Sequence, residues 1–145
     1  MKIHRIDHVG VIVNDLSAAK DFFLDFGLEV HGEWEMEGEL INQVFGLNDV
    51  KVACVGLGTQ DGQVWIELIK FYNPSDERDI QQPFPNTPGI RHIAFAVEDI
   101  DAVVAKLKKK GTKIFSEILH YEERYKLCYC RGPEGIILEL AEKIK

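Results

Sequence analysis

Two histidines and two glutamates recur at matching places in the two halves of the chain. His8 and His92 each lie in a short apolar run, HVGVIV and HIAFAV. Glu67 and Glu139 are each the single acid of an apolar run, WIELI and IILEL. A polar group is costly to bury alone, whereas imidazoles and carboxylates satisfy one another around a cation. The pattern therefore indicates a divalent-metal site whose ligands are His8, Glu67, His92 and Glu139.

These residues belong to an internal repeat. Residues 6–30 align with residues 90–114 without a gap, so that His8 matches His92. Repetition over about half a chain indicates a tandem duplication and not a solenoid. Each copy opens with an apolar strand, and an aspartate, Asp15 or Asp99, then stands at the expected N-cap of an amphipathic helix.

Three further strands are expected after each helix. Each half therefore predicts a βαβββ module, and the fold class is α+β. Segment 37–48 of the first half predicts an added short helix or a loop. The further strands are expected near residues 28–35, 50–57 and 63–71 and near residues 113–119, 125–131 and 135–141.

We expect one domain over residues 1–145, built from module one (about 1–72), a linker (about 73–89) and module two (about 90–145). The linker holds four of the five prolines, which is typical of a connecting segment.

Composition narrows the classes of partner. The net charge of -7 and the pI near 5.2 argue against nucleic acid or an anionic membrane as the main partner. No apolar stretch has the length of a membrane span, and we expect a cytoplasmic protein. Three cysteines, Cys54, Cys128 and Cys130, indicate reduced core thiols and not a disulfide framework.

Four segments resemble the vicinal oxygen chelate superfamily, namely IDHVGVIVNDL, WIEL, GIRHIAFAVEDID and GPEGIILEL. That superfamily includes glyoxalase I, methylmalonyl-CoA epimerase, extradiol dioxygenases, and fosfomycin- and bleomycin-resistance proteins. The resemblance implies that the two βαβββ modules form a half-open mixed β-barrel around a metal, with the helices outside. It also implies the ligands His8, Glu67, His92 and Glu139, and a homodimer.

The ligand set points to part of the superfamily. Two imidazoles and two carboxylates are similar to the set of bacterial glyoxalase I and suit one Ni, Zn, Co or Mn ion per site. His8, His92 and Glu139 could instead supply the Fe(II) triad of an extradiol dioxygenase. Glutathione-dependent members have an arginine near the first helix and an asparagine just after the first-module glutamate. No arginine lies between Asp7 and Asp76 here, which argues against glutathione.

The resemblance implies a metal-dependent lyase, isomerase or epimerase that acts on a small hydroxycarbonyl or dicarbonyl substrate. A proton would leave the carbon next to a chelated carbonyl, with Glu139 or Glu67 as the base. Two alternatives stay open, an extradiol-type dioxygenase and a non-catalytic resistance protein that sequesters a ligand. The residues expected to line the substrate pocket are Phe45, Trp65, Phe71, His120, Arg124 and Tyr129.

Overall fold

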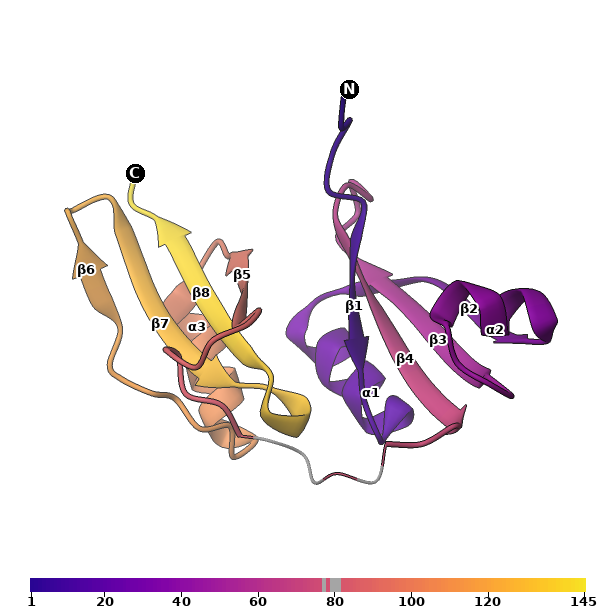
Figure 1. Ribbon diagram of the computed structural model, residues 1–145. Helices are drawn as coiled ribbons and strands as arrows, with labels where there is room; N and C mark the ends of the chain where they lie inside the picture. The colour runs from indigo at the N-terminus through magenta and orange to yellow at the C-terminus, as the bar shows by residue number, and fades with distance from the viewer. Residues whose placement is uncertain (77, 79–81) are drawn as a thin grey trace. The chain divides into compact units, whose positions relative to one another are not determined.

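The computed structural model describes residues 1–76, 78 and 82–145. The chain divides into two compact units, Met1–Asp79 and Ile80–Lys145, each of which carries one module (Figure 1). Part of the expected linker, residues 77 and 79–81, lies outside the described residues. None of the helices among the described residues is long and apolar enough to cross a membrane.

The first unit is a βαβββ module with one added helix. Its four strands form one mixed sheet in the order β1-β4-β3-β2, in which β1 and β4 are parallel and the other pairs antiparallel. The added helix, α2, lies in the segment that the sequence left open between helix and loop. The elements are β1 (His8–Ile12), α1 (Leu16–Phe26), β2 (Glu29–Glu37), α2 (Glu39–Phe45), β3 (Lys51–Gly58) and β4 (Trp65–Asn73).

The second unit repeats this topology. Its sheet has the order β5-β8-β7-β6, and β5 pairs in parallel with β8 as β1 does with β4. The two open, mixed sheets confirm the predicted α+β class and the tandem βαβββ modules. The elements are β5 (His92–Ala96), α3 (Ile100–Lys109), β6 (Leu119–Tyr121), β7 (Tyr125–Arg131), the 3-10 turn η1 (Pro133–Gly135) and β8 (Ile137–Lys143).

Both long helices begin where the sequence predicts. The Asp15 side chain accepts a hydrogen bond from the backbone N–H of Ala18, and the Asp99 side chain accepts one from that of Ala102. Each carboxylate thus satisfies an N–H that has no partner within its helix. At the end of α1, Gly27 has a φ of 121°, a conformation that strongly favours glycine.

Side chains alternate along β4, so the sheet of module one has two different faces. Ile66 and Leu68 are buried, and α1 contacts both β3 and β4. Trp65 and Glu67 alternate with them and point to the opposite face. Part of that opposite face is closed by an apolar cluster, which consists of Val50, Val52, Cys54 and Ile69 with Trp34, Met36, Ile41, Phe45 and Phe71 packed against them.

One strand prediction is wrong in module two. Instead of a strand over 113–119, Ile114 makes an isolated bridge to Cys130, and β6 begins only at Leu119. The backbone still follows β7, since the Phe115 N–H donates to the Tyr129 carbonyl over 2.9 Å. The chain then leaves the ladder at Ser116, whose hydroxyl donates to the carbonyl of Glu117. Short polar side chains compete in this way with strand pairing.

The cysteines behave as predicted. Cys54, Cys128 and Cys130 are free and buried. Burial raises the pKa of the Cys54 thiol to about 11 and that of Cys130 to about 12. They are therefore protonated thiols that fill the cores of the two modules.

Candidate metal centre

His8 and Glu67 face each other across two neighbouring strands of module one. In the β1–β4 register His8 lies beside Trp65, and Gly10 lies beside Glu67. Paired residues point to the same face of a sheet, so His8 and Glu67 share the face opposite to α1. His8 Nε2 lies 4.0 Å from Glu67 Oε1. Two residues that are 59 positions apart in the sequence thus form a close imidazole–carboxylate pair.

Asp7 fixes the orientation of the His8 ring. The Asp7 Oδ2 atom lies 2.8 Å from His8 Nδ1, and Arg5 donates to Asp7 Oδ1 over 2.9 Å. The hydrogen bonds from His8 and then from Arg5 lower the pKa of Asp7, so its carboxylate is ionised and accepts the Nδ1 proton. In a neutral imidazole that donates through Nδ1, Nε2 carries the lone pair that a metal needs. A carboxylate behind a histidine is the usual partner of a metal-ligating imidazole.

Trp65 supports the other side of this arrangement. Its indole stacks on the His8 ring at 4.4 Å with an interplanar angle of 24°, and Trp34 meets it edge-on at 6.0 Å. Both indoles lie over Gly56, where an added Cβ would stand 3.1 Å from Trp65 and 3.3 Å from Trp34. Glycine at this position therefore leaves room for the indole that holds His8.

The geometry of this pair fits a cation. The 4.0 Å separation does not exceed the sum of two metal–ligand bonds of about 2.0–2.2 Å each, so one ion can reach both atoms. The His8 side chain is 39% exposed and that of Glu67 is 15% exposed. The sequence suggested buried polar groups, but the histidine lies on an open sheet face with its carboxylate partner beneath. Solvent can therefore reach the pair from that face.

Module two arranges its own pair differently. His92 is on β5, and Glu139 is on β8 beside Ala94. Tyr129 of β7 lies opposite Glu139 in the register and makes a ring contact with His92 at 5.1 Å and 42°. Desolvation, followed by the charge of Glu139 and a hydrogen bond to its carboxylate, raises the pKa of Tyr129. The phenol is therefore neutral, and it links His92 to Glu139 by touching both.

The structure thus brings His8 together with Glu67, and it connects His92 to Glu139 through Tyr129. The two pairs belong to different units, and their convergence on one cation stays a prediction.

Another acidic group lies at the start of α3. Asp99, Asp101 and Glu142 bring carboxylate oxygens within 4.8 Å of one another. Each has a structural role, because Glu142 accepts from the Ile100 N–H over 3.0 Å and Asp101 pairs with Lys126 over 3.2 Å. The Asp99 carboxylate is the N-cap of the helix. Negative charge at a helix N-terminus is stabilising. The start of α3 therefore accounts for the clustering of these three carboxylates without a bound metal.

The residues predicted to line the pocket lie at separate places within their modules. Phe45 and Phe71 meet edge-on at 5.3 Å at the far end of β4, and Trp65 lies at its beginning, on His8. His120 is on the short strand β6, opposite Lys126. Arg124 lies in the β6–β7 turn, where its N–H donates to the Tyr121 carbonyl. It is five residues from Tyr129, roughly 16 Å along β7 at about 3.3 Å per residue.

Sequence reasoning missed Asp7, Trp34 and Gly56. Asp7 directly precedes His8, so a signal existed in the sequence: a carboxylate next to a candidate ligand. Trp34 and Gly56 carry no comparable signal, because their role depends on the strand register.

Comparisons with known proteins agree with this architecture. The family model of the Glyoxalase/Bleomycin resistance protein/Dioxygenase superfamily matches residues 5–140. The crystal structure of a glyoxalase family protein from Bacillus cereus superposes with a TM-score of 0.94; it is 38% identical, and the match covers 100% of this chain and 97% of that one.

More distant matches span nearly the same length. The uncharacterized protein YaeR of Escherichia coli is 26% identical over 141 residues, which are 97% of this chain and 98% of YaeR. The trypanothione-dependent glyoxalase I of Leishmania major shares the fold, with a TM-score of 0.68 and 22% identity over 97% of this chain and 87% of that one.

Proposed function

Because the chain belongs to the Glyoxalase/Bleomycin resistance protein/Dioxygenase superfamily, we propose that it is a divalent-metal-dependent lyase, isomerase or epimerase. It would move a proton at the carbon next to the carbonyl of a small hydroxycarbonyl or dicarbonyl substrate. The observation that supports this most is the His8–Glu67 pair at 4.0 Å, with Asp7 on the far nitrogen of the imidazole. His8, Glu67, His92 and Glu139 would hold the ion.

When bound, the cation would polarise the substrate carbonyl and acidify the neighbouring C–H bond. The remaining steps belong to side chains of this protein. A carboxylate must accept the proton within hydrogen-bond reach of that carbon, and Glu139 and Glu67 are the candidates. Tyr129 lies beside Glu139 in the register of β7 and β8, so its phenol can hold that carboxylate in place. Glu67 has no such contact with Trp65, whose indole instead stacks on His8.

The Glu67 side chain favours this function over the alternatives. A dioxygenase of the extradiol type needs two histidines and one carboxylate, which His8, His92 and Glu139 would supply. Glu67 would then be a surplus carboxylate, yet it faces His8 Nε2 directly. A protein that only sequesters a ligand has no need for a carboxylate aimed at an oriented imidazole.

The test is metal analysis of the purified protein, joined to a proton-exchange assay. We expect about one Ni, Zn, Co or Mn ion per site, and metal-dependent deuterium incorporation next to the carbonyl of hydroxycarbonyl probes in D₂O. Glu67→Gln should weaken metal binding or abolish the exchange. Glu35→Gln is a matched control, because Glu35 is an exposed carboxylate on β2. Stoichiometric Fe(II) with O₂ uptake on catechols would instead favour the dioxygenase, and absence of any bound metal would refute the proposal.

A further inference from the structure

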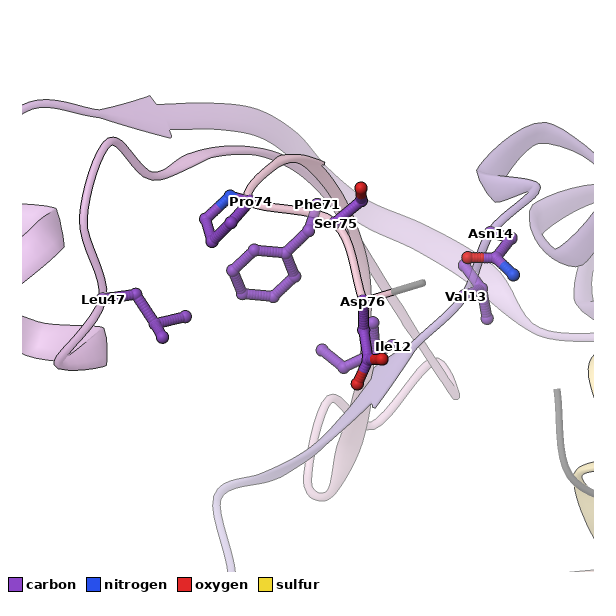
Figure 2. Close-up of a pocket in the computed structure, with 8 residues that line it drawn as sticks. All are labelled: Ile12, Val13, Asn14, Leu47, Phe71, Pro74, Ser75 and Asp76. Carbon is purple, nitrogen blue, oxygen red and sulfur yellow. The ribbon is translucent and has the colours of Figure 1, made fainter. Parts of the chain in front are cut away.

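A cavity of about 290 Å³ opens in module one at the ends of β1 and β4 (Figure 2). Its lining is mainly apolar, and Figure 2 shows the Phe71 ring turned toward Leu47. The volume lies at the lower limit of the about 300–1,000 Å³ that is typical of small-molecule sites. The cavity therefore suits one substituent of a ligand. The apolar lining residues are Ile12, Val13, Leu47, Phe71 and Pro74.

This cavity lies on the same sheet face as the ligand pair. Alternation along β1 places Ile12 on the face of His8, and alternation along β4 places Phe71 on the face of Glu67. Each is four residues beyond its ligand, roughly 13 Å along the strand at about 3.3 Å per residue. The metal ligands and the cavity thus stand at the two ends of one surface.

Gly10 keeps the path between them open. It lies on the same face, midway between His8 and Ile12 and beside Glu67 in the register. Gly10 has no side chain, and a Cβ built there would meet only Ile69 Cδ1, at 3.7 Å. The face of β1 between His8 and Ile12 is therefore an exposed strip of bare backbone.

The rim of the cavity is polar but carries little net charge. Asn14, Ser75 and Asp76 line it beside the apolar residues. The Asp76 carboxylate is held by the Arg78 guanidinium in an ion pair. A cationic group on a ligand would therefore gain little at this rim, and a neutral group is favoured.

We infer that the substrate carries a neutral, apolar tail that crosses Gly10 and enters this cavity while its vicinal oxygens face His8 and Glu67. The substrate class is then a hydroxycarbonyl or dicarbonyl compound with a medium-length alkyl or aryl substituent. This inference rests on the proposed function for the position of the oxygens. Module two differs at the equivalent places, because Ala94, Ala96 and Lys143 stand where module one has Gly10, Ile12 and Phe71. A cavity also lies at that end of module two, but its lining is mainly charged and includes Glu98 and Lys143.

The first test uses two hydroxamates as chelating probes on the Co²⁺-loaded protein. Acetohydroxamate has the oxygen pair alone, and octanohydroxamate adds six methylenes. Each buried methylene strengthens binding about fourfold, from about 0.8 kcal/mol per CH₂. With partial burial we expect octanohydroxamate to bind at least about 100-fold more tightly. An equal Kd for the two probes would overturn the inference.

Two substitutions locate the tail. Gly10→Val fills the strip and Ile12→Ser makes the cavity polar; both should reduce the preference for octanohydroxamate at least about tenfold and leave the acetohydroxamate Kd unchanged. Ile6→Ser is the matched control, since Ile6 is an exposed isoleucine of module one that does not line the cavity. A preference that persists in both cavity variants would place the tail elsewhere and refute the inference.

A metal-free arm separates this inference from the proposed function. With labelled methyl groups, 1-hexanol added to the apo protein should shift the NMR signals of Ile12, Val13 and Leu47. Ile3 and Ile6 methyls, outside the cavity lining, should not shift. Shifts without any metal binding would retain an apolar site and reject only the metal-dependent reaction. If hexanol causes no shift, the cavity does not accept an apolar group and the inference fails whatever the metal analysis gives.

Discussion

The two modules have the same topology but surround their histidine–glutamate pairs differently. In module one, an aspartate precedes the histidine and a glycine lies opposite the glutamate: Asp7 binds His8, and Gly56 faces Glu67. In module two, Arg91 takes the place of Asp7 and Tyr129 takes the place of Gly56. Both histidines contact an aromatic ring, but Trp65 reaches His8 from β4 while Tyr129 reaches His92 from β7.

This difference suggests a division of roles after duplication. Module one has a histidine whose Nδ1 contacts Asp7 and whose Nε2 already faces a carboxylate, an arrangement that favours firm ligation. Module two has a carboxylate beside a neutral phenol, an arrangement that can position a base. Arg91 cannot replace Asp7, because it is a cation and its guanidinium lies over Gly89. We therefore expect substitutions at equivalent positions to have unequal effects.

The largest effect is expected from the histidines themselves. His8→Ala and His92→Ala should each weaken binding of Zn²⁺ or Co²⁺ by more than about 100-fold. Mutation of a residue that only hydrogen-bonds to a metal ligand already lowers metal affinity roughly 10–100-fold. Metal competition titration measures this, and His4→Ala is the control because His4 is exposed near the N-terminus. If only one of the two histidines mattered, the modules would not share an ion, and the four-ligand site would be wrong.

Substitution of Asp7 should have the second-largest effect on metal affinity. Asp7→Asn replaces an acceptor by a group that can also donate, so the His8 tautomer is no longer fixed and metal affinity should fall roughly 10–100-fold. Arg91→Gln at the equivalent position should leave the affinity unchanged within about threefold, since Arg91 lies over Gly89. Equal losses in the two variants would show that the modules do not differ in the way described above.

Tyr129 should affect turnover more than metal binding. Tyr129→Phe removes the hydroxyl through which Tyr129 can donate to the neighbouring Glu139, and it keeps the ring beside His92. A hydrogen bond to a charged group contributes about 1.5–3 kcal/mol, so we expect kcat for proton exchange to fall at least about tenfold. The metal Kd should change little. A fall in metal affinity without a change in kcat would make Tyr129 a support for the ligand and not for the base.

Features of the fold and of the candidate site could be predicted from the sequence where they depend on a local residue pattern. The repeat, the helix starts at Asp15 and Asp99 and the four candidate ligands are local patterns, and the two helix starts are confirmed. Gly56 could not be recognised, because its importance comes from two indoles that reach it from β2 and β4. The cavity of module one also depends on how distant residues come together. The sequence predicted Phe71 as a pocket-lining residue but not Ile12 or Pro74. The prediction of a strand over 113–119 was wrong because the segment is interrupted at Ser116, whose hydroxyl donates a hydrogen bond to the Glu117 carbonyl.

Gly56→Ala should have a smaller effect, mainly on stability. The new methyl group would lie 3.1 Å from the Trp65 ring and 3.3 Å from that of Trp34, which forces both indoles to move. Overpacking of this kind costs about 1–3 kcal/mol. Urea unfolding measures the loss, and a weaker metal affinity should accompany it because Trp65 supports His8. The control is Gly10→Ala, where the added methyl would meet only Ile69 Cδ1 at 3.7 Å and stability should hold.

The smallest effects are expected at the helix starts, where the modules also differ. Asp15→Ala should lower the free energy of unfolding by about 1 kcal/mol, the usual contribution of an N-cap. Asp99→Ala should lower it less, because Glu142 Oε2 already accepts from the Ile100 N–H at the same helix start, over 3.0 Å. Urea denaturation of the two variants and of Asp99→Ala combined with Glu142→Gln tests this. If Glu142 supports the start of α3, the double variant should lose more free energy of unfolding than the sum of the losses in its single variants. Strictly additive losses would mean that the two carboxylates act independently, so that Glu142 is not a second cap for α3.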